Sequence, residues 1–589
     1  MKHVLKNIRY MLKQVRDAHR GFLPVCLLVQ LAGVVSPLTS VLGLKVLFDA
    51  LTGGVQPLTL AAVAGVYGLV NGGYGVLMAW YQNSYLPVAK VKIQGAISST
   101  LMRKAASLDL ANFDDATFYN RYTRAINEAN TRAVDVAETV CAMAGNVLSI
   151  AVLATMILVI EPVVLLCSLV GVAISLVFDL IRARMQYRFD LETTPYNRRL
   201  SYIQRIFYEP QYAKELRLFR MGTPGMRKYL DENGQLAGVL RRQGRKRFAL
   251  QGAERFVNEG LFVGVALIYL GWRALTGAIG IGSLSAMFNA AFQFGGQLNS
   301  FVSKFPALYQ HSLFIDNLLA VLSARSGTEP GGPLPLDPSR PHSITLQGVS
   351  FSYGSGKAAL SGVSLHVGAG EKVAVVGYNG AGKSTLVKLM TRLYDPDAGS
   401  VLLDGVDIRE YSAESLRSGM GVVMQDFQHY AFSLAENVKP GFVPGEESDV
   451  QDALKFAGLS ERVEKLPKGI HSPITREFES DGVMMSGGEF QKLSLARAWA
   501  QDAHVLILDE LSSALDPVAE YELNQAILQA VRDRTVVFIS HRLSATRMAD
   551  RIYMMEGGRV AEEGTHDQLM QRGGKYALLY RMQAEKYAG

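Results

Sequence analysis

The chain has 589 residues, which is too long for one domain, and 49% of them are hydrophobic, which is apolar for a soluble enzyme. The formal net charge of +7 does not require a nucleic-acid partner, because a membrane protein with basic cytosolic loops has the same surplus. Only three cysteines occur, all in apolar runs, so neither a disulfide framework nor a metal-binding cysteine cluster is indicated.

The first 20 residues alternate basic and apolar side chains at helical spacing. This pattern predicts an amphipathic helix (1–20) that lies on the inner membrane surface. A signal peptide is the alternative, but the apolar run that follows is too long for its hydrophobic region, and a clear small-residue cleavage site is lacking.

Residues 21–322 contain six apolar segments. The length of each is close to the roughly 20 residues that a helix needs to cross a bilayer. The predicted spans are Phe22–Leu47, Leu58–Tyr81, Ala137–Ile160, Val163–Ile181, Gly260–Leu275 and Leu284–Phe305. Short connections lack Lys and Arg, whereas the long connections are basic, so both termini and both long loops are expected in the cytosol. A basic run at 241–247 could bind nucleic acid or anionic lipid, and a solvated helix face is the simpler interpretation.

Both long connections, 88–130 and 185–256, have regular helical patterning, which predicts helices that extend the spans into the cytosol. A Pro/Gly-rich stretch at 323–342 then predicts a linker. Beyond it, residues 343–589 alternate short apolar strands with helices, which indicates an α/β phosphate-loop domain.

The sequence Gly377-Tyr-Asn-Gly-Ala-Gly-Lys-Ser384 follows an apolar strand and precedes a helical stretch. Its glycines allow backbone N–H groups to surround phosphate oxygens, and the helix N-terminus adds a positive dipole. Lys383 is expected to reach the β- and γ-phosphates and Ser384 to bind Mg²⁺. The predicted nucleotide-binding residues here are Gly377, Asn379, Gly380, Ala381, Gly382, Lys383, Ser384 and Thr385.

Polar residues follow three further predicted strands. Asp509 is expected to hold Mg²⁺ and Glu510 to polarise the attacking water. Gln425 is placed near the metal or the water, and His541 near the γ-phosphate, although either residue taken singly could be structural. Parallel strands bind ligands at their carboxyl ends, so these residues are expected to meet.

Met485-Ser-Gly-Gly-Glu489, ahead of a helical stretch and the Asp509 strand, resembles the signature motif of ATP-binding cassette (ABC) proteins. The resemblance extends from Ser343 to about Tyr587 and implies that Tyr353 stacks on adenine and that Ser513-Ala-Leu-Asp516 is the D-loop. It also implies that Ser486, Gly487 and Gly488 act on ATP bound by a second subunit. Met485, Glu489 and Leu511-Ser512 depart from the usual pattern without removing a phosphate-binding or catalytic group.

The resemblance implies an ABC exporter half-transporter: a six-span helical membrane domain fused to an α/β ATPase cassette, in the cytoplasmic membrane with the cassette in the cytosol. A homodimer would hydrolyse MgATP and export an amphipathic small molecule or peptide. Coupling helices are expected at 114–122 and 208–217. Alternatives are a lipid flippase, a subunit of a heterodimeric multidrug exporter, and an ATP-gated regulator or channel.

Polar side chains inside spans usually face protein or water, so they are candidates for cargo contacts or for hydrogen bonds between helices. The candidates are Gln30, Tyr67, Asn71, Tyr74, Asn146, Asp179, Asn289, Gln293, Gln297 and Asn299. The predicted spans contain few charges and several aromatic residues, which favours an amphipathic or neutral cargo over a small ion.

Overall fold

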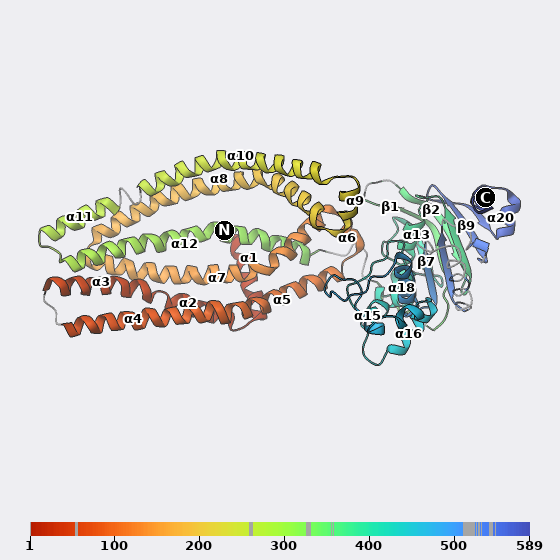
Figure 1. Cartoon of the computed structure of the whole chain (residues 1–589), viewed down its shortest axis with the longest axis horizontal. Coiled ribbons are helices and arrows are strands. Elements are labelled where there is room, and N and C mark those ends of the chain that lie inside the picture. Colours follow the sequence, from red (N-terminus) through yellow and green to blue (C-terminus); the bar gives the residue numbers. More distant parts are fainter. Residues whose placement is uncertain are drawn as a thin grey trace. The chain divides into compact units, whose positions relative to one another are not determined.

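The chain divides into two compact units in a computed structural model. Unit 1 comprises Met1–Ala106 and Thr117–Ala324, and unit 2 comprises Ser107–Ala116 and Arg325–Gly589 (Figure 1). The residues that the structure describes are 2–53, 57–257, 263–324, 331–337, 339–354, 356, 358–510, 523, 525, 527, 531, 533–540, 546–547 and 549–588.

The described part of unit 1 is helical. Its elements are α1 (Lys2–Ala18), α2 (Phe22–Ala32), α3 (Val35–Gly53), α4 (Pro57–Trp80), a π-helical turn η1 (Tyr81–Tyr85), α5 (Leu86–Ala106), α7 (Ala116–Ile160), α8 (Pro162–Tyr208), η2 (Pro210–Tyr212), α9 (Ala213–Leu218), α10 (Gly222–Arg255), α11 (Val263–Leu275) and α12 (Ile281–Leu322). The first predicted span is interrupted at Gly33, where a Cβ atom would lie 2.8 Å from the Tyr74 hydroxyl of α4. Glycine there lets α4 approach the junction of α2 and α3.

Among the described residues, four helical segments are long and apolar enough to cross a membrane, so the chain is a membrane-spanning protein. They are Phe22–Gly53, Leu58–Ala106, Arg132–Ile160 and Pro162–Gln186, and Val263–Leu275 is a shorter apolar helix. The predicted count of six spans is therefore not confirmed. The fifth predicted span begins at Gly260, which lies outside the described residues. The sixth lies within the 42-residue α12, which carries Asn289, Gln293, Gln297 and Asn299 and is less apolar than the other four.

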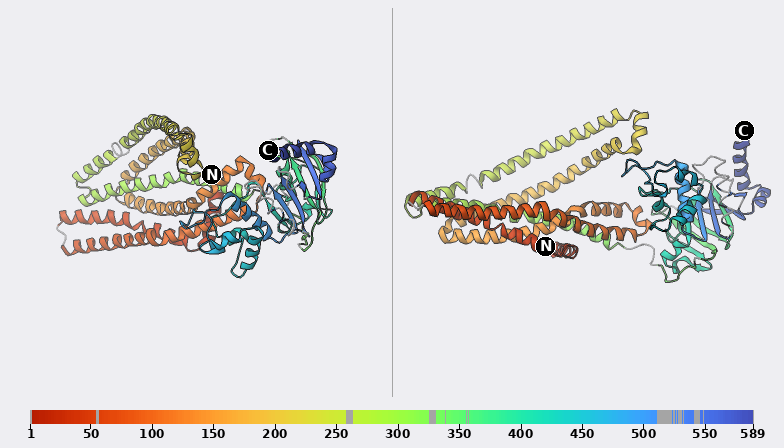
Figure 2. Two further views of the ribbon diagram at one scale, coloured as in Figure 1. Left: turned by 45° about the vertical axis from the view of Figure 1, so that its right-hand side comes forward. Right: turned by 60° about the horizontal axis from the view of Figure 1, so that its bottom comes forward.

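The long connections form continuous helices, as predicted. α7 has 45 residues, α8 has 47, and α8 lies beside α10 (Figures 1 and 2). The second segment predicted to couple the domains, 208–217, contains the short helices η2 and α9. The first, 114–122, does not form a short helix of its own: α6 (Leu110–Asp114) ends where it begins, and α7 begins at Ala116. The coupling role of both segments stays a prediction. The predicted 114–122 segment is mostly the start of α7 because Phe118 and Tyr122, one turn apart, stack together and pack against the core of unit 1.

The described part of unit 2 contains two sheets. The antiparallel sheet has strand order β2-β1-β4-β5, and the other has order β10-β9-β3-β8-β7-β6, in which β9, β3, β8, β7 and β6 are parallel. The strands are β1 (Ile344–Ser352), β2 (Ala358–Val367), β3 (Lys372–Gly377), β4 (Ala398–Leu403), β5 (Val406–Asp407), β6 (Met420–Val423), β7 (Val505–Asp509), β8 (Thr535–Ser540), β9 (Arg551–Glu556) and β10 (Arg559–Gly564). The helices are α6, α13 (Lys383–Met390), α14 (Ala413–Ser418), α15 (Leu434–Val438), α16 (Glu447–Phe456), α17 (Ser460–Glu464), α18 (Gly487–Trp499), α20 (His566–Arg572) and α21 (Lys575–Ala588), with short 3-10 turns η4 (Ile408–Glu410) and η5 (Gly469–His471).

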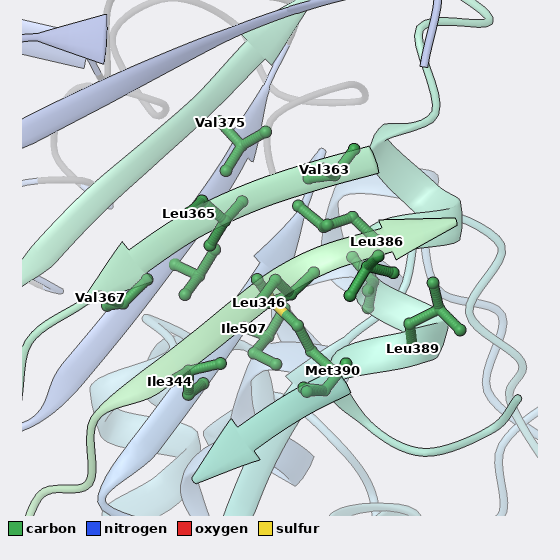
Figure 3. Close-up of a cluster of buried hydrophobic side chains, with 14 of the residues drawn as sticks. Ile344, Leu346, Val363, Leu365, Val367, Val375, Leu386, Leu389, Met390 and Ile507 are labelled. Atoms are coloured by element: carbon green, nitrogen blue, oxygen red, sulfur yellow. The ribbon is translucent and has the colours of Figure 1, made fainter. Parts of the chain in front are cut away.

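The main core of unit 2 joins the two sheets through α13 (Figure 3). Leu386 and Met390 of α13 pack between Leu346 of the antiparallel sheet and Val375 and Ile507 of the parallel sheet. All five side chains are at most 1% exposed. This packing fixes the start of α13, and with it the loop between β3 and α13, at the carboxyl edge of the parallel strands.

Candidate functional site

The glycine-rich loop connects β3 to α13 as the sequence predicts. Gly380 and Gly382 adopt left-handed backbone conformations with φ of +80° and +99°. A Cβ at Gly382 would lie 2.6 Å from a methyl carbon of Leu360 and 2.9 Å from the Ala359 carbonyl oxygen. Glycine is therefore required at position 382 for both conformation and space.

Lys383 is held at the mouth of this loop. Its Nζ donates hydrogen bonds to the carbonyl oxygens of Gly377, at 2.9 Å, and Tyr378, at 3.2 Å. Burial lowers the pKa of Lys383, whereas the nearby carboxylates of Glu510 and Asp509 act in the opposite direction. A buried cation beside backbone N–H groups is suited to bind phosphate oxygens.

Asp509 ends β7 and is 2% exposed. Its pKa is raised to about 6, mainly by burial and in part by the neighbouring Glu510 carboxylate, whereas the Ser384 hydroxyl and Lys383 act to lower it. One carboxylate oxygen, Oδ1, is buried without a hydrogen-bond partner in the described part of the chain. The Asp509 carboxylate lies beside the Ser384 hydroxyl, and the Gln425 amide contacts the neighbouring Glu510. Together these groups offer oxygen donors of the kind that Mg²⁺ prefers.

Glu510 is fixed on both its backbone and its side chain. Its φ of +51° is unusual for a residue with a side chain. The backbone N–H donates to the Ile539 carbonyl at 2.9 Å, and the carbonyl accepts from Nε2 of Gln491 at 3.0 Å. Nε2 of Gln425 donates to the Glu510 carboxylate at 2.6 Å. The structure thus brings the predicted Gln425 and Glu510 together and holds the carboxylate in a strained, defined position.

Gln491 is a positioning residue that the sequence analysis missed. It lies on α18, is 2% exposed, and contacts a residue 19 positions further along the chain. A polar side chain on the buried face of a predicted helix was the available signal, but it did not identify the partner.

Tyr353 follows β1 and lies beside the start of α13. Its hydroxyl and the Thr385 hydroxyl form a hydrogen bond of 3.2 Å, and the Lys388 ammonium lies 5.2 Å from the centre of its ring. Phe351 and Tyr394 contact the ring edge-to-face, with centroids at 5.0 and 5.6 Å. The structure therefore brings an aromatic ring to the residue that follows the phosphate loop.

Ser486 is the N-cap of α18. Its hydroxyl accepts from the Glu489 N–H at 3.2 Å, and the Glu489 carboxylate accepts from the Ser486 N–H at 2.7 Å. This capping box leaves Ser486 and Gly487 exposed at the tip of the helix.

Known proteins with similar sequences and folds agree with a nucleotide-binding site of this geometry. The family profile described as ABC transporter matches residues 360–513. The ATP-dependent lipid A-core flippase of Burkholderia orbicola is 40% identical over 259 residues, covering 44% of this chain and 43% of the flippase. The subtilin transport ATP-binding protein SpaT of Bacillus subtilis is 28% identical over 478 residues, covering 80% of this chain and 76% of that protein. Residues 360–513 thus match the ABC transporter family.

A solved structure of a bacterial Atm1-family ABC exporter with ATP bound has the same fold, with a TM-score of 0.76 over 97% of this chain and 98% of that chain at 23% identity. The matched region spans less than half the length of the B. orbicola flippase. Unit 2 is thus an ABC cassette, a nucleotide-binding domain, and it is fused to a helical membrane-spanning unit.

Two residues expected in the ABC site, His541 and Asp516, lie outside the described residues, as do Leu511-Ser512 and the rest of the D-loop. Two departures from the family signature have structural explanations. Met485 is 8% exposed and packs in the core around α18, and the Glu489 carboxylate pairs with Arg462 at 3.0 Å. Neither departure removes a group from the phosphate loop.

Several polar residues of the spans form hydrogen bonds between helices. Asn71 donates to Thr39 at 3.0 Å, and the Asn146 amide bonds with Ser300 at 3.1 Å. Asn289 contacts Ser40 at 3.5 Å. These three residues therefore serve helix packing in this structure.

One predicted residue, Asn299, lines a cavity of about 370 Å³ between α8, α10, α11 and α12. The wall is apolar at Val172, Phe288 and Phe292 and charged at Arg182 and Glu254, which form an ion pair. The cavity therefore combines apolar surface with a charged end, as an amphipathic molecule would require.

Proposed function

We propose that the chain is an exporter half-transporter of the cytoplasmic membrane, which forms a homodimer and couples ATP hydrolysis to the outward movement of an amphipathic small molecule or peptide. The observation that carries this proposal is the joining, in one chain, of membrane-spanning helices to a cassette in which Lys383, Asp509 and the Gln425–Glu510 pair converge.

Hydrolysis requires an attacking water, a base and a stabilised phosphate. Lys383 and the loop N–H groups bind the β- and γ-phosphates, and Tyr353 supplies a ring face for adenine. The Glu510 carboxylate accepts a proton from the water as its oxygen attacks the γ-phosphorus, and ADP leaves. Ser384, Asp509 and Gln425 would hold Mg²⁺, which neutralises charge on the phosphate oxygens when bound.

The position of the signature motif supports the proposed homodimer. Ser486, Gly487 and the half-buried Gly488 form the tip of α18, whereas Lys383 lies at the start of α13. In the proposed dimer each tip closes the ATP site of the other subunit, which gives two composite sites. Closure then reaches the membrane helices through α6 and α9. Within unit 2, Asp114 at the end of α6 accepts a hydrogen bond from Tyr394, whose ring contacts Tyr353.

A lipid flippase is the second candidate for the transported molecule. It is favoured by the cavity beside α8, which has an apolar wall and a charged end. The matching Burkholderia relatives are named as lipid A-core flippases, and a B. subtilis relative is named as a subtilin transporter, so both lipid and peptide cargo belong in the test.

Glu510→Gln tests the ATPase assignment. This variant should bind ATP as tightly as the wild type, and its hydrolysis rate should fall at least about 100-fold because the base is lost. The matched control is Glu461→Gln, which neutralises an exposed carboxylate on α17. Both proteins are assayed in proteoliposomes with labelled ATP, fluorescent phospholipids and labelled amphipathic peptides.

Hydrolysis by Glu510→Gln at the wild-type rate would refute the role of the base. ATP-dependent movement of lipid but not peptide would select the flippase, and the converse would select peptide export. ATPase activity with no transport of either class would refute the proposed cargo class.

A further inference from the structure

The helix α1 presents two opposite faces. Asn7, Ile8, Met11 and Val15 are its buried residues. They pack against α5 and α12, and the Asn7 amide donates to Ser312 Oγ at 2.9 Å and to Asp316 at 2.7 Å. The apolar face of α1 therefore packs on protein and is not available to insert into a bilayer.

The outward face of α1 is a basic stripe. Its members are Lys2, Lys6, Arg9, Lys13 and Arg16, and all five are exposed. Their spacing of 4, 3, 4 and 3 residues keeps them on one side of a helix, along about 21 Å of its length. Four of the five form no ion pair within the described part of the chain, and the Arg16 guanidinium meets only the exposed Asp17, at 3.4 Å.

The basic stripe borders a groove of about 760 Å³ that also includes Leu5, Tyr10, Leu12 and Leu23. Leu5 is 62% exposed, and Leu23 lies in the first turn of α2, where the first apolar segment begins. The groove therefore lies next to the entry of the chain into the membrane. It offers cations to bind an anionic group and apolar side chains to contact the apolar part of the same ligand.

We propose that the basic stripe of α1 is a binding site for anionic phospholipid headgroups of the membrane leaflet from which α2 starts. The occupant is chosen by charge complementarity, because five cations on one face favour a dense array of phosphates over a neutral surface. The leucines border the headgroup layer, which favours a lipid over a free phosphate. This inference rests on the membrane-spanning character of the chain, and it does not depend on the cargo or on ATP hydrolysis.

The probe is phosphatidylglycerol, with phosphatidylcholine as the zwitterionic comparison. The full chain in detergent is titrated with each lipid, and bound lipid is counted by native mass spectrometry. The wild type should prefer phosphatidylglycerol at low salt and lose most of that preference at about 0.5 M salt. Because each basic residue near an anionic surface strengthens binding about fivefold, K6Q/R9Q/K13Q should weaken phosphatidylglycerol binding at least about tenfold.

Two further variants separate a binding site from total charge. R198Q/R227Q/K228Q removes three exposed charges from α8 and α10 and should bind phosphatidylglycerol as the wild type does. K6R/R9K/K13R keeps the charge of the stripe and should also bind normally. Circular dichroism should show every variant folded, because the stripe lies opposite the packing face.

Hydrogen exchange on the wild-type chain locates the site without a variant. Amides of residues 2–18 should exchange more slowly in nanodiscs that contain phosphatidylglycerol than in nanodiscs of phosphatidylcholine alone.

Equal binding of the two lipids, unchanged binding by K6Q/R9Q/K13Q, or unchanged exchange of α1 would overturn the proposal. Stronger binding of glycerol phosphate, an acidic peptide or RNA than of phosphatidylglycerol would instead assign the stripe to a soluble ligand. Loss of ATPase activity in E510Q would leave these outcomes unaffected, so the two proposals fail separately.

Discussion

Asp509→Asn should make the folded cassette more stable while it removes a proposed Mg²⁺ ligand. Asp509 is buried, and burial raises its pKa from the ordinary 3.8 to about 6. At neutral pH the folded state therefore holds a charge that the unfolded chain carries more easily in water. Asparagine has nearly the same shape without that charge.

The magnitude follows from proton linkage. An aspartate with a raised pKa binds a proton in the folded state at pH values where the unfolded chain has released it, so stability falls as pH rises from about 4 to about 6. Above that window the cost levels off at about 3 kcal/mol for the pKa difference given above. At pH 5 about half of the cost is present.

Hydrogen exchange of the β3 and β7 amides in the detergent-solubilised full chain measures this gain. In Asp509→Asn these amides should exchange about 100-fold more slowly than in the wild type at pH 7.5, and about tenfold more slowly at pH 5. Asp452→Asn, an exposed substitution on α16, is the control and should change exchange little. MgATP should then slow exchange in the wild type but much less in Asp509→Asn.

Equal exchange of Asp509→Asn and wild type at pH 7.5 would refute the burial argument. A gain of the same size at pH 5 and pH 7.5 would show that the effect is packing and not charge.

Three further substitutions test other parts of the chain. Gly382→Ala should destabilise the cassette by about 1–3 kcal/mol and weaken binding of a fluorescent ATP analogue, because alanine must adopt φ of +99°. Ser486→Ala removes the cap shared with Glu489 and should cost about 1 kcal/mol in thermal unfolding, whereas Ser486→Thr should retain most of that stability. Glu161→Ala leaves Arg273 without its 2.9 Å partner and should lower the stability of unit 1 by about 2 kcal/mol, less than for a fully buried pair because Arg273 is 35% exposed. Unchanged thermal unfolding midpoints in the latter two variants would contradict the roles given to the cap and the ion pair.

The sequence by itself determined the local features of this protein. The phosphate loop follows from the order of strand, glycines and helix, and the Ser486 cap follows from a polar residue before a helical run. The long helices α7, α8 and α10 follow from unbroken periodicity. In each case the interacting residues are only a few positions apart in the chain, so their pattern can be recognised in the amino-acid sequence.

Only the tertiary structure decided which distant residues meet. The hydrogen bond from Gln491 to Glu510 and that from Tyr394 to Asp114 join segments whose contact depends on how β7, α18, α13 and α6 are placed. Residues 1–20 were predicted as an amphipathic helix, and the structure shows that the apolar face of α1 packs on α5 and α12. Amphipathicity shows that a face is buried but not against what, because the hydrophobic effect is non-directional. The sixth predicted span illustrates the same point. The helix α12 that carries it has polar side chains that lower its hydropathy, and one of them, Asn289, contacts a neighbouring helix.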